Sequence, residues 1–192
     1  MLAWLRQRET LRRTARSLYG SIVTQSRSHA FYADWGVPDT HEGRFEVIAL
    51  HLALVLRRLA AEGQPGQALG RTLTEAFVVD LDDTLREMTV GDLAVPKQVK
   101  HAVAALHDRY STYGAALDSP APEALGSAVR ARLGELRGAQ ALDVEAISAY
   151  IREAAGALAR QAGVEVLGGQ LAWPQVHAGS GDRTDAGRRR QP

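Results

Sequence analysis

The sequence contains no cysteine, which removes a large group of sites at once. Disulfides, thiolate zinc sites, iron–sulfur clusters and cysteine nucleophiles are all excluded. Long apolar runs are missing too, because the longest uncharged apolar run, between Glu46 and Arg57, is about half of the roughly 20 residues that span a bilayer. The first 20 residues carry six charges and no apolar segment, so no secretory signal is expected.

An excess of charge of one sign is also missing, since the formal net charge is +1. A chain so balanced lacks the overall basic character of nucleic-acid-binding proteins, and no DNA partner is expected. The ends differ from the body: residues 1–20 hold five arginines against one glutamate, and residues 180–192 hold four arginines against two aspartates. We expect a mildly acidic body with basic ends. Lysine occurs only at Lys97 and Lys100.

Helix-forming residues dominate what is present. Ala, Leu and Arg are abundant, Ile is rare, and no long stretch alternates apolar and polar residues. This composition predicts an all-α fold, a single bundle-like domain of about six or seven helices. The expected layout is a basic amphipathic helix at 1–16, the helical domain at 17–175 and a disordered basic tail at 176–192.

Helices are expected at residues 1–16, 17–34, 42–62, 67–88, 96–117, 123–136 and 144–161. The third is apolar on most faces, which is typical of a helix in the middle of a bundle. Breaks are expected at residues 35–40, 63–66, 90–93 and 119–122. Asp39 or Thr40 and Asp143 are suited to cap helices, and Pro96 to stand in a first turn.

Residues 74–100 contain the most suggestive motif. Phe77-Val78-Val79 followed by Asp80-Leu81-Asp82 resembles the nucleophile motif of haloacid-dehalogenase phosphatases, whose two aspartates attack phosphorus, transfer protons and help to hold magnesium. The nucleophile of such an enzyme sits at the end of a parallel strand. No other strand candidate follows at suitable spacing, and no adjacent acidic pair lies downstream. A magnesium-dependent phosphatase using Asp80 and Asp82 therefore stands as the alternative hypothesis.

The same stretch can also be interpreted as helix. Asp80 and Asp83 then share one face with Glu87, which indicates an acidic stripe in solvent. In this interpretation the chain has no catalytic residue, no metal and no cofactor.

A set of ordered segments covers more of the chain than the phosphatase motif. The segments are LYGSIVTQSR at 18–27, Phe31-Tyr32, GVPDT at 36–40, GRFE at 43–46, LHL at 50–52, DLDDTLRE at 80–87, VGDL at 90–93 and PKQVK at 96–100. In this order, over residues 18–117, they resemble the ubiquinol–cytochrome c chaperone family. The compact basic start and Trp173-Pro174 resemble a bacterial member.

The resemblance implies a helical protein without enzymatic activity, which binds newly made cytochrome b and promotes assembly of the cytochrome bc1 complex. Mitochondrial members work with a small partner subunit and near the ribosome, and the resemblance does not extend either partner to a bacterial member. We expect a cytoplasmic protein that can lie peripherally at the inner-membrane face. A general helical scaffold for another membrane client is a third hypothesis.

The candidate client- or partner-binding residues are Phe31, Tyr32, Trp35, Asp39, Arg44, Asp80, Asp83, Arg86, Asp92, Lys97 and Lys100. The three aromatic residues either pack in the core or line a client groove, since aromatic side chains dominate binding hot spots. Arg44 either pairs with Asp39 or an acid of residues 80–87, or is solvated. The residues around 92–100 either form a contact surface or fix a helix junction.

Two further features have alternative interpretations. His51 lies in the most apolar helix, where a hydrogen-bonded core histidine is favoured over a haem ligand. Residues 1–16 could contact anionic lipid or ribosomal RNA, or lie free in solvent.

Overall fold

The computed structural model describes residues 2–87 and 95–176, and within them the chain is helical with no strand. The helices are α1 (Leu2–Ser26), α2 (His29–Ala33), α3 (His41–Ala60), α4 (Gly63–Glu87), α5 (Val95–Asp118), α6 (Ala124–Leu133), the 3-10 helix η1 (Ala139–Ala141), α7 (Val144–Arg160) and α8 (Gly163–Leu167). The predicted all-α class is confirmed. No helix among these residues is long and apolar enough to span a membrane.

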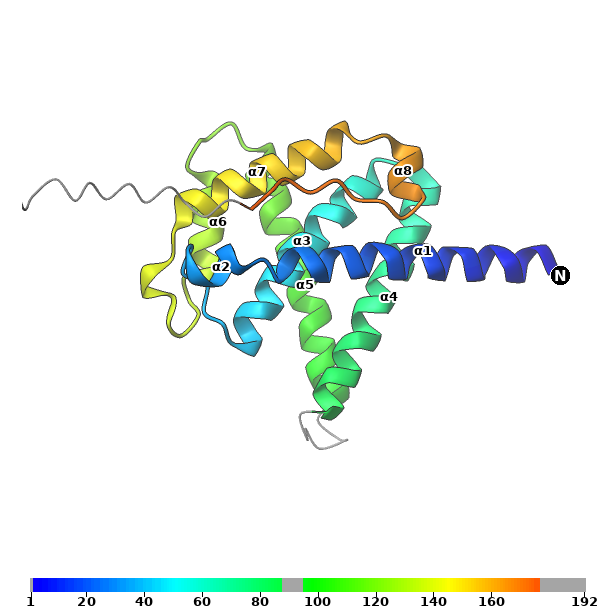
Figure 1. The fold of residues 1–192 in the computed structure, drawn as a ribbon, viewed down its shortest axis with the longest axis horizontal. Coiled ribbons are helices and arrows are strands. Elements are labelled where there is room, and N and C mark those ends of the chain that lie inside the picture. Colours follow the sequence, from blue (N-terminus) through cyan, green and yellow to red (C-terminus); the bar gives the residue numbers. More distant parts are fainter. Residues whose placement is uncertain (1, 88–94, 177–192) are drawn as a thin grey trace, which may run out of the picture.

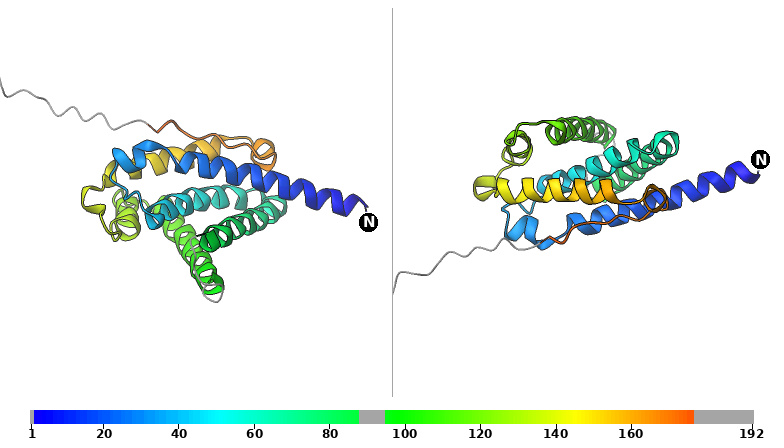
Figure 2. Two further views of the ribbon diagram at one scale, coloured as in Figure 1. Left: turned by 60° about the horizontal axis from the view of Figure 1, so that its bottom comes forward. Right: turned by 90° about the horizontal axis from the view of Figure 1, so that it is seen from above.

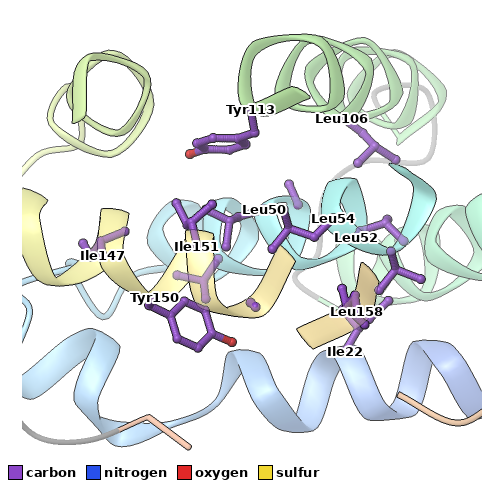
Figure 3. Packing of buried hydrophobic residues seen from close by; sticks show 14 of the residues in the cluster. Ile22, Leu50, Leu52, Leu54, Leu106, Tyr113, Ile147, Tyr150, Ile151 and Leu158 are labelled. Carbon is purple, nitrogen blue, oxygen red and sulfur yellow. The ribbon is translucent and has the colours of Figure 1, made fainter. Parts of the chain in front are cut away.

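α3 lies in the middle of the molecule, with α1, α4, α5 and α7 packed around it (Figure 1). Its Leu50, Leu52 and Leu54 are almost completely buried. Figure 3 shows them between Ile22 of α1, Leu106 and Tyr113 of α5, and four side chains of α7. This arrangement confirms the expected central place of the apolar helix, because only a helix surrounded by others can bury so many faces.

Several predicted helix ends are confirmed. Thr40 caps α3 by accepting a hydrogen bond from the backbone nitrogen of Gly43 at 3.1 Å. Asp143 caps α7 by accepting from the nitrogen of Ala146 at 2.9 Å. Pro96 is the second residue of α5. Short polar side chains before an apolar run and proline in a first turn are therefore reliable signals in this chain.

Two predicted boundaries are wrong. The helices expected at 1–16 and 17–34 form one helix as far as Ser26, because no glycine or proline interrupts it at residues 16 and 17. The break expected at 63–66 instead begins α4: Gly63 takes a φ of +65°, and Pro65 stands in the first turn, where its missing N–H costs little. The break expected at 90–93 and residues 177–192 of the expected tail lie outside the described residues.

The chain end described by the structure returns to α1. After α8, residues 168–176, named here the C-terminal strap, run along α1 and α7 (Figure 1). Ser17 Oγ donates to the carbonyl oxygen of Gly169 at 3.0 Å, and Trp173 Nε1 donates to Ser21 Oγ at 3.0 Å. Gln25 Nε2 adds a bond to the carbonyl oxygen of Pro174 at 3.2 Å. The strap therefore fastens the end of the fold to its beginning.

His51 is fully buried and uses both ring nitrogens. Nδ1 lies 2.7 Å from the carbonyl oxygen of Val47, and Nε2 lies 2.7 Å from the hydroxyl of Tyr150. A carbonyl only accepts, so Nδ1 carries the proton and Nε2 accepts from Tyr150, whose oxygen accepts in turn from Gln25. The prediction of a hydrogen-bonded core histidine is confirmed.

Burial lowers the pKa of His51 to about 4 from an ordinary 6.5. In the unfolded chain this histidine binds a proton below about pH 6.5, whereas the folded protein does not until about pH 4. The neutral His51 therefore contributes its full share of the stability above pH 6.5, and this contribution is lost as the pH falls toward 4. At about 1.4 kcal/mol for each pKa unit, the loss is about 3 kcal/mol.

The measurement is urea unfolding of the protein and of His51→Gln at several pH values. Between pH 7 and pH 4 we expect the unmodified protein to lose about 3 kcal/mol of stability relative to His51→Gln. Below pH 4 this relative loss should level off. A difference that stays constant with pH would contradict the buried neutral state.

Candidate functional site

A groove of about 810 Å³ lies where α3, α4 and α5 meet. In Figure 1, α4 and α5 approach each other at one end and diverge toward the other, where α3 crosses them. The lining residues are Leu56, Leu59 and Ala60 of α3, Gly66, Gln67, Gly70, Arg71, Thr74, Glu75, Val78 and Val79 of α4, and Val103, Leu106, His107 and Tyr110 of α5. Most of these side chains are apolar or small.

Two glycines bring α4 close to the end of α3. A Cβ on Gly66 would lie 1.9 Å from the carbonyl oxygen of Leu59, and one on Gly70 would lie 3.3 Å from a methyl carbon of Leu56. The first position therefore admits only glycine without a backbone shift. The GxxxG spacing at 66–70 thus fixes one wall of the groove against α3, and buried Leu59 and Leu106 contribute to its lining.

Exposed apolar side chains collect at this groove. Val79 is 59% exposed and Val103 is 37% exposed, and both line it, one from α4 and one from α5. Arg71, Glu75 and His107 are also exposed and place polar groups in the lining. An apolar surface with polar neighbours is typical of a site that binds another protein segment.

The opposite side of α4 is closed by α1. Phe77 is buried and meets the ring of Tyr19 edge-on, with centroids 6.4 Å apart. The Tyr19 hydroxyl donates to Asp80 Oδ2 at 2.8 Å, and burial together with this carboxylate raises the pKa of Tyr19. Phe77 is covered by α1 in this way, whereas Thr74 and Val78 of the same helix line the groove.

The phosphatase hypothesis is wrong, because a helix occupies the place of the strand that it requires before Asp80. Phe77-Val78-Val79 lies inside α4, so Asp80 does not follow a strand. At about 100° of rotation for each residue, Asp80 and Asp82 point roughly 160° apart around the helix. Each has a structural partner instead: Tyr19 for Asp80, and Arg86 at 2.7 Å for Asp82. Two carboxylates on opposite sides of a helix cannot act on one phosphorus atom.

The aromatic candidates near the second helix lie inside the molecule. Phe31 is 1% exposed and Trp35 is 5% exposed, and their ring centroids are 5.0 Å apart. The ring of Phe31 also meets Tyr150 and His51 at 5.1 and 5.4 Å. Tyr32 is half-buried, and its hydroxyl donates to the carbonyl oxygen of Ser26 at 2.8 Å. Of the two interpretations considered, core packing accounts for Phe31 and Trp35.

Arg44 pairs with Asp39, one of its two expected partners. Nε and Nη2 of Arg44 donate to Oδ1 and Oδ2 of Asp39 at 2.6 and 3.2 Å. Both side chains are more than half exposed. The guanidinium lowers the pKa of the Asp39 carboxyl below its usual range. The pair spans the turn before α3 at the surface and leaves a binding role for these residues as a prediction.

The remaining candidates lie near the connection between α4 and α5. Asp83 and Arg86 are exposed at the end of α4, and Lys97 and Lys100 are exposed at the start of α5 (Figure 1). Asp92 lies outside the described residues. These side chains belong to the end of the helix pair remote from α3, so none of them lines the groove. Their role as a contact surface stays a prediction.

An ion-pair cluster around buried Glu46, which joins α3, α5 and α6, was missed from the sequence. Glu46 is 6% exposed and accepts two hydrogen bonds from Arg109, at 3.0 and 2.5 Å. Asp108 pairs with both Arg109 and Arg132 at 2.9 Å. A glutamate within the most apolar helix was the available signal, because a buried carboxylate needs a cationic partner. The cluster fixes how α5 crosses α3, and hence the shape of the groove.

A sequence model of the ubiquinol-cytochrome C chaperone family matches residues 33–173, which is more than half of the chain. The chain belongs to this family. The match begins in α2 and ends at Trp173 of the strap, so the whole groove lies within it. The family resemblance seen in the ordered segments of the sequence is therefore confirmed, and the family is one of chaperones rather than of enzymes.

This member of the chaperone family is also similar to a solved structure. The crystal structure of the Cbp3 homolog from Brucella abortus is 30% identical, covers 92% of this chain and 98% of its own, and superposes with a TM-score of 0.78. Among curated proteins no match is found. The similarity over nearly the full length of both chains indicates that the fold described above is that of the family.

Proposed function

We propose that this protein is an assembly chaperone that binds newly made cytochrome b and promotes assembly of the cytochrome bc1 complex. The observation that carries the proposal is the groove between α3, α4 and α5, which lies within the region matched by the family. The transmembrane helices of a client such as cytochrome b are apolar over about 20 residues each. Until they are packed they need a surface that covers them, and an apolar groove is such a surface.

The mechanism is binding without chemistry. Leu56, Val78 and Val103 offer apolar contacts to one side of a client helix, and Arg71 and Glu75 place charges beside them. Fully burying a Val or Leu side chain contributes roughly 1.5–3 kcal/mol, but association itself consumes a large part of such gains. A groove of this size therefore supports reversible holding, which lets the client pass on to its partner subunits.

We place this activity at the cytoplasmic face of the inner membrane, where cytochrome b is inserted. Contact with a ribosome or a small partner subunit, which the resemblance gives for mitochondrial members, stays a prediction for this chain. The competing scaffold hypothesis predicts the same groove with a different membrane client, so the identity of the bound protein separates the two.

The test is to place negative charges in the groove and to measure how much cytochrome b the protein retains. We expect the variant Val79→Asp/Val103→Asp to retain its helical circular dichroism spectrum, since both side chains are exposed, and to recover at least tenfold less cytochrome b when purified from membranes. Val164→Asp is the matched control, because Val164 is 78% exposed on α8 and outside the groove. It should behave like the unmodified protein.

Cytochrome b recovery and bc1 activity that are unchanged in the groove variant would contradict the proposal. Loss of a different membrane protein, with cytochrome b never enriched, would favour the general scaffold.

A further inference from the structure

α1 extends past the body of the molecule at its N-terminal end (Figures 1 and 2). Five arginines lie along it, Arg6, Arg8, Arg12, Arg13 and Arg16, and all are exposed. One acidic residue, Glu9, stands among them. The first half of the helix is therefore a strongly basic rod attached to a body whose own charges sum to an acidic excess.

Four of the five arginines, all except Arg8, occupy the outward half of α1. The inward side is set by Ala15, Leu18 and Ile22, which are all completely buried. At about 100° for each residue, Arg6, Arg12, Arg13 and Arg16 lie roughly 90° or more from that side. The basic charge is thus concentrated on the side of the helix that faces away from the core.

Leu5 distinguishes between the possible anionic partners. It is 51% exposed and lies on the same outward half of α1 as the arginines. An apolar side chain between cationic ones suits a helix that lies in the headgroup region of a bilayer, where the chain enters the acyl boundary and the guanidinium groups meet phosphates. A surface for RNA gains nothing from an exposed leucine, because phosphate contacts dominate that binding.

We propose that the outward face of α1, formed by Arg6, Arg12, Arg13, Arg16 and Leu5, binds membranes that contain anionic phospholipid. The acidic body is repelled by the same surface, so the charge asymmetry orients the molecule with α1 toward the lipid. Membrane binding by this face does not require the proposed client, but it deepens the proposed function by bringing the groove to the place where a membrane protein is made.

α1 and the groove use different sides of α4. Phe77 and Asp80 face α1, whereas Thr74 and Val78 line the groove. Lipid bound to the outward face of α1 is therefore separated from the groove by both helices, and the groove stays open to a client.

The experiment is sedimentation of the full chain with vesicles of 7:3 phosphatidylcholine and phosphatidylglycerol. We expect binding at low salt that falls steeply at high salt and is absent with pure phosphatidylcholine. The variant Arg6→Gln/Arg12→Gln/Arg13→Gln should bind about a hundredfold more weakly, since each arginine near such a surface contributes roughly a factor of five. The matched control, Arg130→Gln/Arg137→Gln/Arg160→Gln, removes the same charge from exposed positions elsewhere and should bind normally.

Three results would overturn the proposal: equal weakening in both triple variants, equal binding to pure phosphatidylcholine, or tighter binding to a duplex RNA than to the anionic vesicles at the same salt. Failure of this proposal is distinguishable from failure of the proposed function. The charged-groove variant should still bind vesicles, and the arginine variant should still retain cytochrome b in a detergent extract.

Discussion

Replacing Arg109 with alanine is expected to lower the free energy of unfolding by about 3–5 kcal/mol. Arg109 holds both carboxylate oxygens of Glu46, and Glu46 is 6% exposed in the central helix. Without the guanidinium, that carboxylate must stay charged without a partner, take up a proton, or pull α3 and α5 apart. Urea unfolding followed by circular dichroism at pH 7 measures the loss.

Two comparisons separate the buried ion pair from ordinary surface charge. Arg44→Ala breaks a bidentate pair that is more than half exposed, so we expect little change in stability. The double variant Glu46→Gln/Arg109→Met removes both charges and should be more stable than Arg109→Ala alone, because no unpaired charge remains in the core. If Arg109→Ala and Arg44→Ala are equally stable, the cluster does not fix α5 on α3.

Phe31→Ala is expected to cost a similar amount, about 3–5 kcal/mol, through loss of a buried aromatic ring. The ring fills the space between Trp35, His51 and Tyr150, with centroid distances of 5.0, 5.4 and 5.1 Å. Truncation would leave a cavity beside a buried histidine whose hydrogen bonds depend on its neighbours. Thermal unfolding and urea unfolding both measure the effect.

The same variant tests the two interpretations of the aromatic residues. A residue that contacts a client would leave stability unchanged and weaken client binding, whereas a core residue destabilises the fold. Tyr32→Phe is the variant for comparison, because it keeps the ring and removes only the hydrogen bond to Ser26. We expect it to lower the free energy of unfolding by about 1 kcal/mol. A Phe31→Ala protein that is stable but recovers less cytochrome b would instead indicate that Phe31 contacts the client.

Most of the fold could be predicted from local signals. The central helix is recognisable because apolar residues occupy nearly all of its faces, and the caps at Thr40 and Asp143 follow from short polar side chains placed before it and before α7. The same local reasoning failed at residues 63–66, because glycine and proline are as well suited to begin a helix as to end one.

The groove could not be predicted in the same way. Its lining comes from three helices, and which side of α4 remains open depends on α1 having covered the other. Phe77 and Val78 are both apolar, and the sequence pattern does not show which of them packs against another helix. The motif at residues 77–82 misleads for a related reason, since a short apolar run before aspartate fits a strand or a helix until the surrounding packing is known.

The C-terminal strap has a consequence for how this protein is made. Its hydrogen bonds join Ser17 to Gly169 and Ser21 to Trp173, each pair separated by 152 residues of sequence. During synthesis α1 leaves the ribosome before the strap does, so the flank of α1 that the strap covers stays exposed until residues 168–176 have been translated. A protein proposed to protect unfinished chains therefore has an unfinished stage of its own, in which α1 lacks the cover of the strap and is open to aggregation.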